Sequence, residues 1–131
     1  MSAHGFQLNL SLAWIWILLG FLAGSFLGLN FHREEWLGGY GSFQRRLYRL
    51  GHISFFGLAT VNLLFYFTVR SLPSAGPALT IASWGFLLGA LTMPLCCVVM
   101  AHRPKWRLLF LIPVLSLIIG GAFTLSKVLN L

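Results

Sequence analysis

Two histidines of this sequence, His52 and His102, each lie where arginines meet a long apolar run. Imidazoles from two different helices ligate the iron of b-type haems, and haem propionates pair with cations. Arg45, Arg49 and Arg103 would supply those cations, so these five residues form a candidate haem site. A quinone headgroup is the alternative ligand, with the same imidazoles as hydrogen-bond donors. In the simplest interpretation these side chains only contact lipid headgroups at the membrane surface.

A second group of chemically capable residues lies in the stretch MPLCCVVM. Met93, Cys97 and Met100 follow a helical spacing, and Cys96 is adjacent to them. Soft sulfur ligands suit Cu(I), which gives a hypothesis of a homo-oligomeric transporter or copper-handling protein. Met and Cys also serve as adaptable apolar filler in helix packing, and that is the alternative interpretation.

The segments that must position these residues are strongly apolar. Of the 131 residues, 58% are hydrophobic and 8% are charged, whereas soluble domains carry about 25% charged residues. Apolar runs cover residues of about 8–31, 50–69, 78–101 and 108–128, and a helix of about 20 residues crosses the hydrocarbon core. The sequence therefore predicts an all-α membrane protein, with residues 1–131 as one domain of four transmembrane helices in an antiparallel bundle.

The basic residues predict how this bundle lies in the membrane. The connections after the first and third runs hold seven cations, and the opposite side holds Arg70 and Lys127. The positive-inside rule places the seven-cation side in the cytoplasm, with both termini on the periplasmic side of a bacterial inner membrane. We expect the net charge of +7 to attract anionic lipids rather than nucleic acid. The stretch YGSFQRRLYRL predicts a short interfacial helix.

Small residues on two of the predicted helices suggest where helices pack closely. Gly20, Gly24 and Gly28 form two consecutive GxxxG patterns, and Gly85 and Gly89 form another. In lipid, small residues let two helix backbones approach, and this contact stabilises their association. These glycines predict either packing within the bundle or an interface with another membrane subunit.

Three further residues make specific structural predictions. Pro94 and Pro113 lie inside the third and fourth runs, where a missing N–H frees the carbonyl one turn earlier. Asn62 lies in the middle of the second run, and a buried amide in lipid usually bonds to a neighbouring helix.

No motif in the sequence indicates catalysis. The four apolar runs contain no Asp or Glu, whereas proton- or cation-coupled carriers usually need an ionisable group at the midplane. There is also no phosphate-binding loop and no metalloprotease motif. We therefore predict a small, non-catalytic accessory subunit of a larger inner-membrane complex, of a respiratory or electron-transfer kind. A haem- or quinone-binding redox protein is the alternative, and the copper-handling oligomer is a third.

Overall fold

The computed structural model describes residues 3–130, and within that range its regular elements are all helices, without strands. Its elements are η1 (Ala3–Phe6), α1 (Gln7–Asn30), η2 (Trp36–Gly38), α2 (Phe43–Ser71), α3 (Pro77–His102), η3 (Pro104–Phe110) and α4 (Leu111–Leu129). Four stretches, with η3 and α4 counted together, are long and apolar enough to cross a membrane. The all-α class and a multi-pass membrane protein are thus supported.

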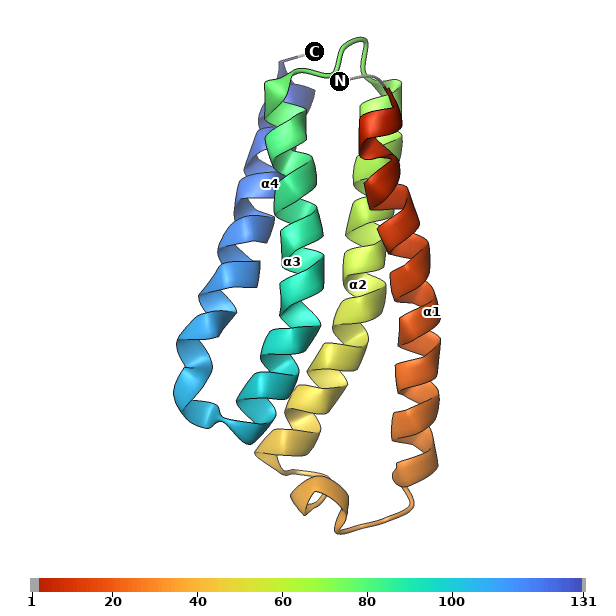
Figure 1. Cartoon of the computed structure of the whole chain (residues 1–131), viewed down its shortest axis with the longest axis vertical. Helices are drawn as coiled ribbons and strands as arrows, with labels where there is room; N and C mark the ends of the chain where they lie inside the picture. Colours follow the sequence, from red (N-terminus) through yellow and green to blue (C-terminus); the bar gives the residue numbers. More distant parts are fainter. Residues whose placement is uncertain (1–2, 131) are drawn as a thin grey trace.

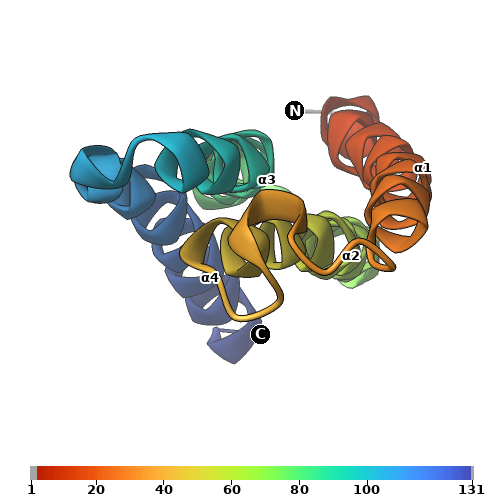
Figure 2. The same cartoon turned by 90° about the horizontal axis from the view of Figure 1, so that it is seen from below.

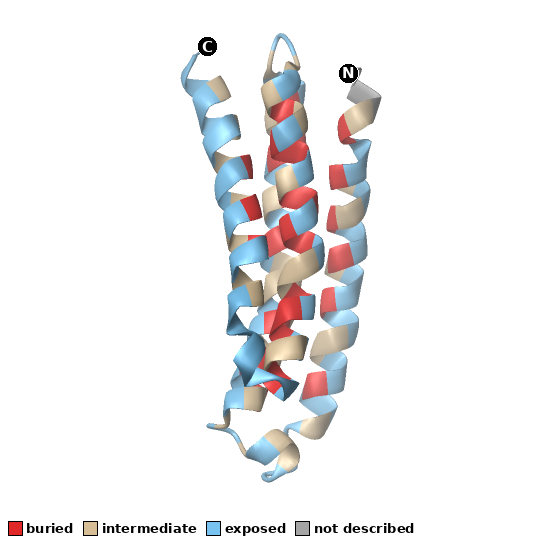
Figure 3. Cartoon of the chain, turned by 60° about the vertical axis from the view of Figure 1, so that its left-hand side comes forward, coloured by how far each residue is buried: buried red, intermediate tan, exposed pale blue. Residues whose placement is uncertain are grey.

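The four long helices form an open row (Figure 1). α1 packs on α2, α2 on α3 and α3 on α4, while α1 and α4 lie at opposite edges of the molecule (Figure 2). Buried residues are concentrated on the central helices, and α1 and α4 are exposed along their outer sides (Figure 3). The row does not close α4 against α1, as a compact four-helix bundle would.

The two ends of the row differ in charge. The start of α1, the end of α4 and the connection between α2 and α3 lie together, at what we call the terminal end (Figure 1). The connection 31–42 and η3 lie at the opposite end, called the basic end here. Its cations are Arg33, Arg45, Arg46, Arg49, Arg103, Lys105 and Arg107.

Residues 43–50 of the stretch predicted as a short interfacial helix form the first turns of α2. The Ser42 side chain accepts a hydrogen bond from the backbone N–H of Arg45, which satisfies one free donor of the first turn. Residues 43–50 contain neither Gly nor Pro, so nothing interrupts the helix before the apolar run begins. α2 therefore starts at Phe43, seven residues before the predicted span.

Polar side chains join α1, α2 and α3 toward the terminal end. Asn9 Nδ2 donates to Asn62 Oδ1 over 2.8 Å, and Ser83 Oγ donates to Asn9 Oδ1 over 2.6 Å. All three residues are buried, and Asn62 Nδ2 donates to the carbonyl of Leu58 in its own helix. The prediction that Asn62 bonds to a neighbouring helix is confirmed, and its partner is Asn9.

Side chains of neighbouring helices bond to the carbonyls one turn before each membrane-span proline. Pro94 offers no N–H to the carbonyl of Ala90, and Trp16 Nε1 of α1 donates to that oxygen over 3.1 Å. Pro113 likewise offers none to the carbonyl of Leu109, to which Cys96 Sγ of α3 donates over 3.5 Å. The prolines thus create acceptors that hold α1 on α3, and α3 on η3.

Candidate ligand-binding groove

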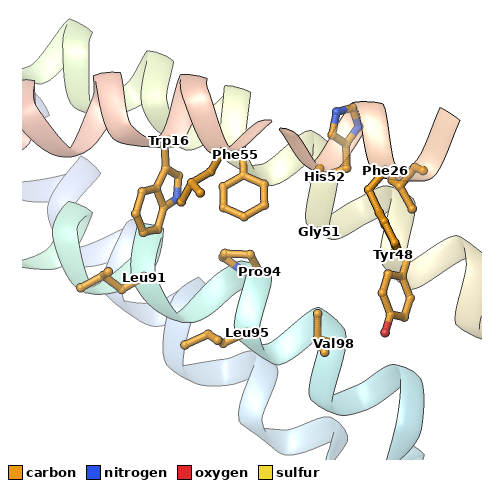
Figure 4. Close-up of a pocket in the computed structure, with 13 residues that line it drawn as sticks. Trp16, Phe26, Tyr48, Gly51, His52, Phe55, Leu91, Pro94, Leu95 and Val98 are labelled. Atoms are coloured by element: carbon orange, nitrogen blue, oxygen red, sulfur yellow. The ribbon is translucent and has the colours of Figure 1, made fainter. Parts of the chain in front are cut away.

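A groove of about 380 Å³ lies between α1 and α3, with α2 as its base (Figure 4). It extends from the Trp16 region toward the basic end. Its wall is mainly apolar and aromatic, with Trp16, Leu19, Phe26, Phe55, Leu95 and Val98 among the lining residues. Tyr48 and His52, one helical turn apart on α2, also belong to the lining, which exposes almost no polar surface. This lining suits a mainly apolar molecule.

His52 lies where α2 passes close to α1. A Cβ atom at position 24 would lie 2.7 Å from Nε2 of His52, so the imidazole occupies the space that Gly24 leaves open. The ring also meets Phe56 edge-on, with centroids 5.5 Å apart. His52 is half-buried and makes no hydrogen bond with any residue that the structure describes. Neither ring nitrogen therefore has a hydrogen-bond partner among the described residues, and Nε2 faces the α1 backbone at Gly24.

His102 does not line the groove and is paired with Tyr48, which does. Its Nε2 is 2.8 Å from the Tyr48 hydroxyl, and the two rings meet edge-on with centroids 5.9 Å apart. His102 is the last residue of α3 and is exposed. In Figure 4 the His52 ring points toward α1, whereas the Tyr48 hydroxyl points away from it. The structure thus brings His102 to Tyr48, and the two histidines face different neighbours.

The three candidate arginines lie outside the groove lining. Arg45 is only 2% exposed, and its guanidinium lies 5.1 Å from the ring centroid of Phe31 and 5.7 Å from that of Tyr40. It also donates to the carbonyl of Phe31 over 3.2 Å. Arg49 stacks on Tyr40 at 4.6 Å, and Arg103 is exposed beyond α3. Arg45 and Arg49 therefore anchor the connection 31–42 to α2.

Two of the three spaced glycines of α1 lie at contacts with α2. A Cβ atom at position 20 would meet the Phe56 ring at 2.7 Å, just as one at position 24 would meet His52. A Cβ atom at position 28 would meet nothing within 4 Å. Gly20 and Gly24 thus allow aromatic and imidazole rings of α2 to approach the α1 backbone, while Gly28 lies beyond this contact.

Gly85 and Gly89 of α3 lie where α4 packs against that helix. A Cβ atom at position 85 would lie 2.7 Å from the carbonyl oxygen of Ser116, and one at position 89 would lie 2.5 Å from Leu117 side-chain atoms. The closest neighbour of Gly85 is therefore backbone, which cannot move aside as a side chain can. These two glycines set how closely α3 and α4 pack.

The sulfur-bearing residues face different neighbours. Cys97 is fully buried beside Gly51 of α2, whereas Cys96 bonds to the carbonyl of Leu109. Both thiols are free. Met93 packs against the cluster that contains Trp16 and Ala90. These contacts are those of packing residues, and they do not direct Cys96 and Cys97 toward one common point.

Sequence reasoning missed two residues that shape the groove. Tyr48 lies in the stretch predicted as a short interfacial helix, with no ligand role assigned to it, and Trp16 was not singled out. The signal for Trp16 was available in part, because Pro94 frees a carbonyl and a tryptophan on another helix can donate to it. No protein-family model, curated protein or solved structure matches this chain.

Proposed function

We propose that this chain is a small, non-catalytic subunit of a larger electron-transfer complex of a bacterial inner membrane, and that it holds a quinone in the groove. The observation that carries this proposal is the imidazole of His52, which belongs to the wall of an apolar groove and has no hydrogen-bond partner among the described residues. A quinone carbonyl accepts a hydrogen bond from such a donor, and its apolar ring and tail match the lining. Placement within a complex would leave the electron transfer itself to partner subunits.

The geometry favours a quinone over a haem. A bis-histidine haem needs two imidazole nitrogens directed at one iron. Here Nε2 of His102 is bonded to Tyr48, and Nε2 of His52 lies against α1 at Gly24. Arg45 and Arg49, which were expected to pair with the propionates, hold the connection 31–42 instead, and Arg103 is exposed beyond α3. A single hydrogen bond to a quinone carbonyl would need only one nitrogen of His52, and Nδ1 is not among the ring atoms nearest to Gly24.

The subunit role is supported by the open row of helices. α1 and α4 are exposed along their outer sides (Figure 3), and helices in lipid associate through such faces when packing allows. In this proposal the basic end faces the cytoplasm, both termini lie on the periplasmic side, and the arginines contact anionic lipid headgroups. The groove then opens in the cytoplasmic half of the bilayer.

Quinone binding to the purified full chain tests the proposal. A short-tailed ubiquinone is titrated in mild detergent and followed by quenching of tryptophan fluorescence, to which Trp16 in the groove wall contributes. We expect saturable binding and an affinity reduced about fivefold or more in His52→Leu, the cost of one hydrogen bond. His32→Leu is the matched control, since His32 is an exposed histidine of the connection 31–42.

Three results would contradict the proposal. One is the absence of saturable quinone binding, and another is an equal affinity in His52→Leu and the unchanged chain. A Soret band with a sharp α-band after dithionite reduction would establish the haem alternative instead. The subunit role fails separately if mild solubilisation of the native membrane yields only the free chain, as native mass spectrometry would show.

A further inference from the structure

A second cavity, of about 360 Å³, lies at the terminal end and is called the terminal hollow here. It is formed by Phe6 of η1, the last turns of α2 and residues 72–75 of the connection to α3. Phe6 and Val69 give it an apolar part that belongs to the buried core. Unlike the groove, the terminal hollow exposes polar and apolar surface in about equal parts. Its lining therefore suits a molecule with both a polar and an apolar portion.

Arg70 is the cation of the terminal hollow, and Tyr66 holds it in position. Nη1 of Arg70 donates to the Tyr66 hydroxyl over 3.1 Å, and the guanidinium carbon lies 5.8 Å from the centroid of the Tyr66 ring. The Tyr66 side chain is buried in the core, which fixes the hydroxyl in place. A guanidinium carries five N–H donors, and no other residue that the structure describes accepts a hydrogen bond from Arg70. The exposed guanidinium thus has donors left for a ligand.

No acidic side chain lies at this end to neutralise Arg70. The only acidic side chains of the sequence are Glu34 and Glu35, which lie on the connection 31–42 at the basic end. Ser74 and Ala75 also line the terminal hollow. Their backbone N–H groups and the Ser74 hydroxyl have no acceptor among the described residues. The polar part of the terminal hollow therefore offers a positive charge and hydrogen-bond donors, which is the chemistry that recognises an anion.

We infer that the terminal hollow binds the phosphate group of an anionic phospholipid, in the leaflet at the terminal end. The planar guanidinium of Arg70 pairs with two phosphate oxygens, and the apolar part of the hollow receives the start of an acyl chain. A zwitterionic headgroup would bring an ammonium group, for which this end holds no acidic side chain. The site lies at the end of the molecule opposite the basic end, and its occupation does not require a bound quinone.

A phosphate group can come from a lipid or from free phosphate in solution, and the lining favours the lipid. A free phosphate would leave the apolar part of the hollow in contact with water, which costs free energy. The terminal hollow also lies where membrane-spanning helices end, the level at which lipid headgroups begin. An arginine that only extended toward the membrane surface would need neither the bond to Tyr66 nor the cavity beside it.

Solution NMR of the full chain in mild detergent tests the site. A short-chain phosphatidylglycerol is titrated, and the backbone amide signals of Leu72, Ser74 and Ala75 report on the terminal hollow separately from lipid bound at the basic end. We expect saturable shifts of these signals, with an affinity about fivefold or more lower in Arg70→Gln. Lys127→Gln is the matched control, because it removes one charge near the same end from a residue outside the hollow. Its affinity should stay within about twofold of the unchanged chain.

Tyr66→Phe removes only the hydroxyl that positions Arg70, and we expect it to weaken binding about twofold or more. The site is wrong if the unchanged chain shows no saturable shift, or if Arg70→Gln and Lys127→Gln lower the affinity equally. An equal affinity for a phosphatidylcholine of the same chain length would overturn the choice of an anionic lipid. Saturable shifts with inorganic phosphate at the affinity of the lipid would show that free phosphate is the ligand instead.

Discussion

The two halves of the molecule use the same three helices in different ways. Toward the terminal end, Asn9, Asn62 and Ser83 join α1, α2 and α3 through buried hydrogen bonds. Toward the basic end, α1 and α3 are separated by the groove, and α1 rests on α2 where His52 meets Gly24. The first half satisfies its polar groups internally, whereas the second leaves an imidazole without a partner among the described residues.

This difference separates polar residues that hold the fold from those available to a ligand. A polar group in hydrocarbon costs free energy unless it is hydrogen-bonded. The amides toward the terminal end are hydrogen-bonded in this way. The hydrogen bond from Trp16 to the carbonyl of Ala90 joins α1 to α3 where the groove begins. Between Trp16 and the basic end, His52 has no hydrogen-bond partner among the described residues, and a bound molecule with an acceptor oxygen would supply one.

The largest expected effect on stability comes from removing the hydrogen bonds that join α1, α2 and α3 toward the terminal end. Asn9→Leu removes the donor to Asn62 Oδ1 and the acceptor of Ser83 Oγ. We expect the free energy of unfolding to fall by about 2 kcal/mol, because two buried polar groups lose their partners. Unfolding in mixed micelles of mild detergent and SDS, followed by circular dichroism, measures the change.

Ser25→Ala is the matched control for this substitution. Ser25 is exposed on the same helix and bonds only to the carbonyl of Phe21 in α1 itself. Its loss should change the free energy of unfolding by less than about 0.5 kcal/mol. Equal effects for Asn9→Leu and Ser25→Ala would show that the polar cluster does not join the three helices.

A smaller effect is expected at the boundary between the halves. Trp16→Phe keeps an aromatic ring but removes the N–H that bonds to the carbonyl of Ala90. We expect a loss of about 1 kcal/mol in the free energy of unfolding, the net value of one such bond. Trp14→Phe, on the exposed side of α1, should cost less.

A second substitution sharpens this prediction. Pro94→Ala restores a backbone N–H that can bond to the carbonyl of Ala90 within α3. The cost of Trp16→Phe should therefore be smaller in the Pro94→Ala background than in the unchanged chain. An equal cost in both backgrounds would mean that Trp16 acts through its ring packing alone.

The helices themselves could be predicted from the sequence, and their contacts only in part. Uninterrupted apolar runs fix four spanning segments because the bilayer sets their length. The carbonyl freed by Pro94 was also predictable, since it follows from proline chemistry alone. The start of α2 at Phe43 was missed because the arginines that follow Ser42 suggested a surface helix, although the serine cap and unbroken helix formers continue into the span.

The groove could not be predicted, because it depends on spacing between separate helices. His52 and His102 were placed at one end of the molecule correctly, yet the sequence does not encode which imidazole meets Tyr48 and which meets Gly24. Arg45 was expected to pair with a ligand, and it is instead buried against Phe31. Such choices are decided by three-dimensional packing.

The smallest expected effect on stability distinguishes the two ends of the α1 glycine stripe. A Cβ atom in Gly24→Ala would meet Nε2 of His52 at 2.7 Å, so the imidazole must move, whereas one in Gly28→Ala meets nothing within 4 Å. Gly28→Ala should raise the free energy of unfolding by about 0.5 kcal/mol through helix propensity, with quinone affinity unchanged. Gly24→Ala should gain no stability and should change quinone affinity about as much as His52→Leu does. The fluorescence titration and the unfolding assay measure both quantities on the same samples. If the two alanine variants bind quinone equally well, the position of the His52 ring against α1 does not govern quinone binding. The imidazole without a partner would then not be what distinguishes the half toward the basic end from the half toward the terminal end.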